Sequence, residues 1–389
     1  MKLADLYVEY RAKGQARIEA SLNSVHRKLR AAESAVVHFA AAFRKVFMVS
    51  AGVIGGTTYA AAKFEDQLAM VSTMLDESTM KHMAAYKKGL SAMSAEFAEG
   101  TGTLSKGLYD ILSASVPAEK AMDVLRTSVI AAKAGMTDTA TSARAIVAVM
   151  NSYQIPVEKA AIVSDKLFAT VKKGVLNFPE LANSIGKAAA TSARAGLSLD
   201  ELLATVATVT RAGISADEAM TAIVGTLRSF FKPTTEGAKA ARELGFELKS
   251  ATLRTEGLSG VMKKLNDLTI DQLAVIFPNI RGIKGVAAAM ADAEGYAENL
   301  ELQMRAGGKT AEAFAKATNT LTFKLGQLKQ EFFAAARELG EEFVPAMERK
   351  VKLLKEAVGW FRKLSPETKS MIARIIGLTA ALSDRKSVV

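Results

Sequence analysis

Apolar residues recur every three or four positions along much of the chain, which is the spacing that places them on one side of an α-helix. In the N-terminal segment, roughly residues 4–45, this spacing is followed by Leu22, Val25, Leu29, Ala32, Val36, Phe39 and Phe43. The positions between them are largely polar and include several Lys and Arg residues. The pattern predicts a basic amphipathic helix with a single apolar stripe.

Residues 46–62 form an uncharged run of small and apolar residues. Within it Gly52 and Gly56 have the GxxxG spacing that lets a second helix approach closely. The run is shorter than the roughly twenty apolar residues that a bilayer span needs, and Ser50 lowers its hydrophobicity further. A tightly packed helix or a hinge is the favoured interpretation, with membrane insertion as the alternative.

Residues 63–300 alternate helical patterns with short breaks, and three breaks share one motif of a cation, Ala, Gly, an apolar residue and a hydroxyl residue. We expect the glycine to take the left-handed position that ends a helix and the hydroxyl residue to cap the next helix. In two of the motifs a Glu follows the Ser by three positions, as in a capping box. The motifs are Lys133–Thr137 around Gly135, Arg194–Ser198 around Gly196 with Glu201, and Arg211–Ser215 around Gly213 with Glu218.

Beyond Gly307 and Gly308 the pattern predicts two long amphipathic helices, 309–339 and 343–364, and a final helix after Pro366. We expect prolines mostly beside helix boundaries, where their missing N–H is tolerated. They are Pro117, Pro156, Pro179, Pro233, Pro278, Pro345 and Pro366. The predicted domains are 1–62, 63–300 and 301–383, followed by residues 384–389.

The six residues Asp384 to Val389 resemble the translation of a common sequencing adapter up to a stop codon. We therefore hypothesise that this ending is an artefact and that the native reading frame continues. The coding DNA tests the hypothesis, because a contiguous native stop codon in the genome would contradict it.

The composition agrees with an all-α fold: 49% of the 389 residues are hydrophobic, and only seven are proline. Cys is absent, which excludes disulfides, thiolate metal sites and Cys nucleophiles. The histidines, His26, His38 and His82, do not have the spacing of a metal site. The polar, charged start of the chain lacks the apolar stretch of a signal peptide, so we expect synthesis in the host cytoplasm.

The net charge of +11 indicates a partner or compartment of negative potential. The basic residues are spread through the chain with few aromatic residues between them, which favours solvated helical faces over a nucleic-acid site. We expect any binding to DNA to be weak, independent of sequence and lost at moderate salt.

No motif predicts catalysis, so we predict no catalytic, cofactor-binding or metal-binding residues and no enzymatic activity. Gly308-Lys309-Thr310 matches only the end of a phosphate-binding loop, because the first glycine of that motif is replaced by Gln303. A carboxylate pair such as Glu65 with Asp110 has nothing to select it. We interpret Glu65 and the adjacent Asp66 as acidic residues at the N-terminal end of a helix.

Residues 61–71, AAKFEDQLAMV, are similar to the opening of the core of phage tail tape measure proteins of the TP901 type, which starts with a Phe-Glu pair. The resemblance covers most of residues 50–380, and its order and spacing are more specific than any one motif. It continues through the three glycine motifs, Gly225–Arg228, Lys232–Thr235, Ala241–Phe246, Ile276–Gly282, Glu338–Gly340 with Pro345, and Leu364–Pro366.

The resemblance implies a structural protein that occupies the lumen of the tail tube, sets tail length during assembly and leaves through the tube at infection. It implies several copies per tail and contacts with the tube protein, the tail assembly chaperones and the tip or baseplate, with a host membrane at infection as a further candidate. The alternatives are a membrane-active helical protein that inserts through residues 46–62 and a muralytic tail enzyme. Liposome leakage or release of peptidoglycan fragments would favour one of these instead.

Overall fold

The computed structural model describes residues 57–363 of the chain. Every regular element in that range is an α-helix or a short 3-10 helix, so the predicted all-α fold is confirmed. The sequence-based division into domains stays a prediction. Several other predictions lie outside the described residues: the basic N-terminal helix, Gly52, Gly56, His26, His38, the final helix after Pro366 and the ending 384–389.

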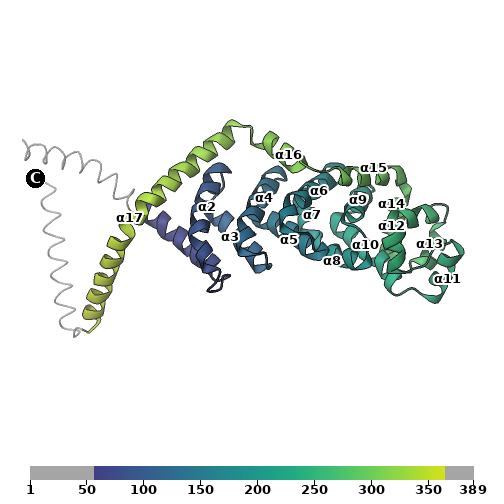
Figure 1. Ribbon diagram of the computed structural model, residues 1–389, viewed down its shortest axis with the longest axis horizontal. Coiled ribbons are helices and arrows are strands. Elements are labelled where there is room, and N and C mark those ends of the chain that lie inside the picture. Colours follow the sequence, from purple (N-terminus) through teal and green to yellow (C-terminus); the bar gives the residue numbers. More distant parts are fainter. Residues whose placement is uncertain (1–56, 364–389) are drawn as a thin grey trace, which may run out of the picture. The chain divides into compact units, whose positions relative to one another are not determined.

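The first described helix spans residues 57–72. The helices that follow, labelled as in Figure 1, are α2 (Met83–Glu96), α3 (Thr101–Ser113), α4 (Ala121–Ala134), α5 (Thr139–Tyr153), α6 (Ala160–Lys173), α7 (Phe178–Ser184), α8 (Gly186–Ala195), α9 (Leu199–Arg211), α10 (Ala216–Phe231), α11 (Thr235–Glu243), α12 (Ser250–Leu265), α13 (Ile270–Ile276), α14 (Ile280–Ala291), α15 (Ala293–Met304), α16 (Lys309–Thr318) and α17 (Leu321–Lys363). Short 3-10 helices precede α2, α4 and α6: η1 (Met80–His82), η2 (Ala118–Lys120) and η3 (Val157–Lys159).

The chain divides into two compact units. One consists of residues 63–335 and is called the helical stack below. The other contains residues 57–62 and 336–363 of the described range.

Within the helical stack, helices pack on neighbours both near and farther along the sequence. The consecutive helices α3, α4 and α5 contact one another, whereas α10 packs on α8 and on α14, which do not adjoin it in sequence. The chain then reverses: α15 lies against α9 and α6, and α16 lies against α6 and α4, along one side of the stack (Figure 1). We call α15 and α16 the returning helices.

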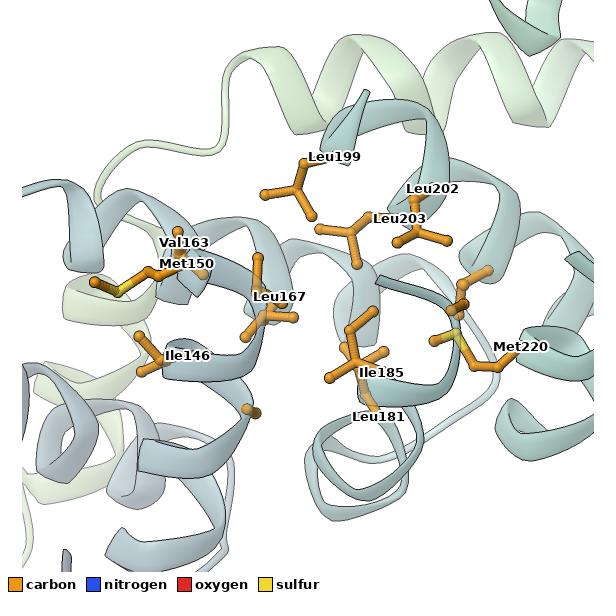
Figure 2. Close-up of a cluster of buried hydrophobic side chains, with 14 of the residues drawn as sticks. Ile146, Met150, Val163, Leu167, Leu181, Ile185, Leu199, Leu202, Leu203 and Met220 are labelled. Atoms are coloured by element: carbon orange, nitrogen blue, oxygen red, sulfur yellow. The ribbon is translucent and has the colours of Figure 1, made fainter. Parts of the chain in front are cut away.

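The core of the helical stack is made by apolar side chains from many short helices. Figure 2 shows part of it, where Leu167 of α6, Leu181 of α7 and Leu203 of α9 are fully buried. Each of these helices supplies only a few turns. Such short helices are marginal in isolation, so the burial of their apolar sides is the main source of their stability.

Two of the three predicted glycine corners have the expected backbone. Gly196 follows α8 with φ of +89°, and the N–H of Leu197 donates to the carbonyl oxygen of Ser192 at 3.0 Å. Gly213 follows α9 with φ of +81°. Both glycines therefore lie in the left-handed region that ends a helix, as predicted.

The prediction for Gly135 is wrong in its mechanism, although α4 does end there. Its φ is −94°, and the left-handed residue is Met136, with φ of +52°. Gly135 instead packs against the ring of Phe178, because a Cβ atom added at Gly135 would lie 2.5 Å from Phe178 Cγ. Space, rather than backbone conformation, requires glycine at this corner.

The predicted caps are correct in one case and altered in two. Ser198 and Glu201 form the complete capping box at the start of α9. Ser215 accepts a hydrogen bond from the N–H of Glu218, but that Glu side chain is directed to Lys284 instead of back to the cap. Thr137 does not cap α5. The adjacent Asp138 does, by accepting from the N–H of Thr141 at 2.9 Å.

The predicted division of the last part into helices 309–339 and 343–364 is wrong. The break comes after α16, at residues 319–320, and α17 then runs from Leu321 to Lys363 through Pro345. Thr320 caps α17, since its Oγ1 accepts from the N–H of Phe323 at 3.1 Å. A proline inside a helix costs about 3 kcal/mol, and the Glu and Leu residues on both sides of Pro345 are helix formers that continue α17 across it.

Candidate functional site: a polar seam along the returning helices

Polar side chains gather where the returning helices contact α6 and α9. We call this group the polar seam. Most of its members are buried in a region where neighbouring helices present apolar residues to one another. It consists of Ser164, Asp165, Lys166, Thr170, Asp200, Thr208, Asn299, Gln303 and Thr310.

The carboxylate of Asp165 binds the N-terminal end of α16. The N–H of Gly308 donates to Oδ2 at 2.7 Å, and the N–H of Thr310 donates to Oδ1 at 2.8 Å. Asp165 is only 7% exposed, so these bonds form away from bulk water. A carboxylate at this position satisfies two free N–H groups and complements the positive end of the helix dipole.

This contact explains the partial match of Gly308-Lys309-Thr310 to a phosphate-binding loop. The backbone N–H groups that would face a phosphate are already occupied by Asp165. The element before them is helix α15 instead of the strand that such a loop requires. Gly308 and Thr310 therefore belong to the capped start of α16, with Asp165 as their acceptor.

Two amides of α15 form the second part of the polar seam. Asn299 Nδ2 donates to Thr208 Oγ1 of α9 at 2.9 Å, and Gln303 Nε2 donates to Thr170 Oγ1 of α6 at 2.9 Å. Both amide residues are 1% exposed. Because a buried polar group is costly without a partner, these bonds favour one position of α15 along α6 and α9.

Lys166 joins three elements. Its ammonium group forms an ion pair with Asp200 at the start of α9 and donates to the carbonyl oxygen of Gln303 at 3.0 Å. It thereby binds the C-terminal part of α15, where the helix dipole is negative. The polar seam is consequently a positioning device for the returning helices, and it contains no nucleophile with an adjacent base.

Sequence analysis did not identify the polar seam, although α15 contains a signal. Tyr296, Asn299 and Gln303 share one side of the helix by their spacing, and all three are buried. Amide residues at positions where a helix buries its apolar side indicate polar partners on the facing helix. The identity of those partners, Thr208 and Thr170, could not be read from the sequence because they lie 91 and 133 residues away from the amides.

The buried tyrosines show no acid–base chemistry near neutral pH. Burial raises the pKa of Tyr86 to about 12, and its hydroxyl donates to the carbonyl oxygen of Ala118 at 2.7 Å. Burial also raises the pKa of Tyr153 and Tyr296 above the ordinary value of a phenol. All three side chains therefore stay neutral at physiological pH.

The carboxylate pair considered from the sequence finds no support as a site. Asp110 Oδ2 accepts from Arg144 at 3.0 Å, and Glu65 lies exposed in the helix of residues 57–72. The interpretation of Glu65 and Asp66 as N-terminal helix residues is wrong, because at least two turns of the same helix precede them. Their neighbour Phe64 is buried, and its apolar contact fixes this part of the helix.

The described residues hold no candidate metal centre. His82 stacks on Tyr86, with ring centroids 6.2 Å apart. Across residues 57–363 no three His, Asp or Glu side chains gather in a way that could hold an ion. The prediction that the chain has no metal, cofactor or catalytic residues stays a prediction.

Residues 87–293 match the family described as phage-related minor tail protein. The chain belongs to this family. The match begins inside α2, ends at the start of α15 and includes all three glycine corners. The match includes the polar-seam residues of α6 and α9, whereas Asn299, Gln303 and Thr310 lie beyond it.

Three relatives of this chain are named as tape measure proteins. The probable tape measure protein of Clostridium phage phiCD119 is 28% identical over 78% of this chain and 33% of its own length. The tape measure protein of Pneumococcus phage Dp-1 is 21% identical over 82% of this chain and 28% of its length. The probable tape measure protein of Escherichia phage P2 is 23% identical over 94% of this chain and 47% of its length.

The chain thus spans between about a quarter and a half of the length of the curated relatives that it matches. No solved structure matches it. The family resemblance drawn from the sequence is confirmed by the family match and by the three relatives.

Proposed function

We propose that this chain is a tail tape measure protein, or part of one, that occupies the tail tube lumen and sets tail length during assembly. The observation that carries the proposal is the alignment of three tape measure proteins with 78–94% of the chain. Its role in the tail is structural rather than enzymatic. The polar seam supports this, since most of its polar groups bind one another and the backbone.

A ruler must convert residue count into distance, and two parts of the molecule differ in this respect. The helical stack folds back on itself, so its residues add little length. α17 has 43 residues in one helix and therefore extends over roughly 64 Å at about 1.5 Å per residue. We infer that measurement depends on long helices such as α17, and that the helical stack is a folded module.

The net charge of +11 fits a chain that is surrounded by a negatively charged tube lumen. In this proposal several copies occupy the tube, contact the tube protein and the tip or baseplate proteins, and leave through the tube at infection. Before incorporation the chain is in the host cytoplasm with the tail assembly chaperones. Weak, salt-sensitive DNA binding is expected on the same grounds.

The experiment changes the length of α17 in the parent phage and measures tails by electron microscopy. An in-frame insertion of 36 helical residues adds ten full turns, so the faces of the helix keep their alignment and the tail should lengthen by about 54 Å. Deletion of about thirty residues should shorten it by roughly 45 Å. A phage with alanine at one exposed position of α17 is the matched control, with unchanged length. Virions of normal length from both length variants would exclude the measuring role.

The two alternative functions have no observation in their favour. Among the helices within residues 57–363, none is both long and apolar enough to cross a membrane. Most of the uncharged run, residues 46–56, lies outside the described part, so insertion through 46–62 stays untested. The polar seam does not contain the arrangement of acid and nucleophile that a muralytic activity would need.

A further inference from the structure

The N-terminal half of α17 has its apolar side turned to solvent. Leu321, Leu325, Leu328 and Phe332 are 73%, 57%, 60% and 70% exposed. We call these four residues the outer stripe. Their spacing of four, three and four residues places them on one side of the helix, in the pattern of a coiled-coil seam.

The opposite side of this half of α17 contacts other helices of the helical stack. Phe323 packs edge-on against Phe314 there, with ring centroids 6.3 Å apart, and the other contacting residues are small or polar. A Cβ atom added at Gly326 would lie 2.9 Å from Ala98 Cβ. Gln327 Nε2 donates to the carbonyl oxygen of Glu96 at 2.7 Å, and Ser94 Oγ donates to Gln330 Oε1 at 3.1 Å. An amphipathic helix normally buries its large apolar residues, so the reversed arrangement of α17 indicates that a further partner covers the outer stripe.

Charged residues beside the outer stripe show what kind of partner fits. Lys324 and Glu331 lie seven residues apart on one flank, and both are exposed. Across residues 57–363, neither side chain has an ion-pair partner in the structure. The other flank carries Thr322 and Lys329. One flank therefore presents both signs of charge, separated by two helical turns.

We propose that the outer stripe binds the outer stripe of a second copy of this chain in an antiparallel helix pair. In this register Leu321 faces Phe332 of the second copy, and Leu325 faces its Leu328. Lys324 then faces Glu331 of the second copy, and two-fold symmetry repeats that ion pair. On the other flank Lys329 faces Thr322, so no like charges oppose one another.

A parallel pair of the same stripes is disfavoured. In parallel register Lys324 of one copy faces Lys329 of the other, and symmetry repeats the repulsion. The antiparallel pair instead matches every charged position with an opposite or neutral one. The charge pattern thus selects both the partner, a second copy, and its orientation.

The contact is small, with four apolar side chains from each copy, and so it forms a weak dimer that depends on concentration. It closes on itself by two-fold symmetry. The inference rests on α17 alone and not on the measuring role. The dimer experiments on the purified chain and the tail-length experiment on the phage can therefore give opposite results.

The first test uses the absence of Cys in the chain, which allows single thiols to be placed without background. Two full-length variants of different tag size, Leu325→Cys and Leu328→Cys, are mixed and mildly oxidised. The antiparallel pair predicts mixed 325–328 disulfides in excess over 325–325 and 328–328. Excess of the two like pairs would show a parallel dimer and overturn the proposal.

The second test measures the dimer constant by sedimentation equilibrium. Lys324→Glu and Glu331→Lys should each raise Kd roughly tenfold, because attraction becomes repulsion at two symmetric places, and the double variant K324E/E331K should restore it. Lys329→Glu is the matched control on the other flank. It should leave Kd nearly unchanged, whereas in a parallel dimer it would tighten binding.

Two outcomes would contradict the second copy as the partner. One is a chain that stays monomeric at every concentration tested and forms no disulfide between copies. The other is a chain that dimerises only after residues 1–45 are removed, which would show that the N-terminal apolar stripe competes for the same surface.

Discussion

α9 and the N-terminal half of α17 have similar apolar periodicity, but their apolar residues differ in burial. In α9 every residue from Leu202 to Thr210 is buried, and Leu203 lies fully inside the core. In α17 the outer stripe is exposed, and apart from Phe323 the residues that face the other helices of the stack are small or polar. The comparison shows that periodicity predicts a helix and its apolar side, whereas what covers that side depends on the rest of the chain or on another molecule.

The largest expected effect comes from making the same substitution, Leu to Ala, in each of the two helices and comparing the loss of stability. Leu203→Ala leaves a cavity in the core and should lower the free energy of unfolding by about 2–5 kcal/mol. Leu328→Ala should change it by less than about 0.5 kcal/mol, because that side chain is already largely in water. Urea unfolding followed by circular dichroism, at a concentration where the chain is monomeric, measures both.

The same pair of variants sharpens the comparison when the protein concentration is raised. If the outer stripe pairs with a second copy, Leu328→Ala becomes destabilising at high concentration, because dimerisation stabilises only the wild-type chain. Leu203→Ala should cost the same at all concentrations. Equal losses for the two variants in dilute solution would mean that Leu328 is covered within one chain.

The polar seam supplies the next largest effect, because it joins the returning helices to the stack by hydrogen bonds instead of apolar contacts. Asp165→Ala leaves the N–H groups of Gly308 and Thr310 without their acceptor and should cost about 1–3 kcal/mol. Asp165→Asn keeps one acceptor oxygen and should cost less. Hydrogen exchange should accelerate in α16 and remain slow in α10. Unchanged exchange at Gly308 and Thr310 in the alanine variant would contradict this role.

The polar seam also shows where sequence reasoning stops. The all-α fold, the end of α8 at Gly196 and the capping box at Ser198 depend on neighbouring residues, and the sequence predicted them. Asp165 binds the start of α16 more than 140 residues later, and nothing near Asp165 indicates that contact. The break between α16 and α17 was misplaced for a related reason. Gly340 and Pro345 are local signals for an ending, but the helix formers around them continue α17.

Gly135 and Gly213 illustrate the same limit within a single motif, and they give the comparison with the smallest expected effects. For Gly135→Ala the backbone is suitable, with φ of −94°, but the new Cβ would lie 2.5 Å from Phe178 Cγ. Such overpacking costs about 1–3 kcal/mol. Phe178→Leu in the same chain should recover part of that loss, which a double-mutant cycle measures.

For Gly213→Ala the surroundings are open, since no atom lies within 4 Å of the added Cβ, and only the φ of +81° opposes the substitution. The expected loss is about 1 kcal/mol, and Gly213→Asn should lose less because Asn tolerates the left-handed region better. Phe178→Leu should add to Gly213→Ala without coupling. Thermal or urea unfolding in which Gly213→Asn is no more stable than Gly213→Ala, or in which Phe178 couples equally to both glycines, would show that the two corners share one mechanism. The structure predicts instead that Gly213 is required by its backbone angle and Gly135 by its neighbour.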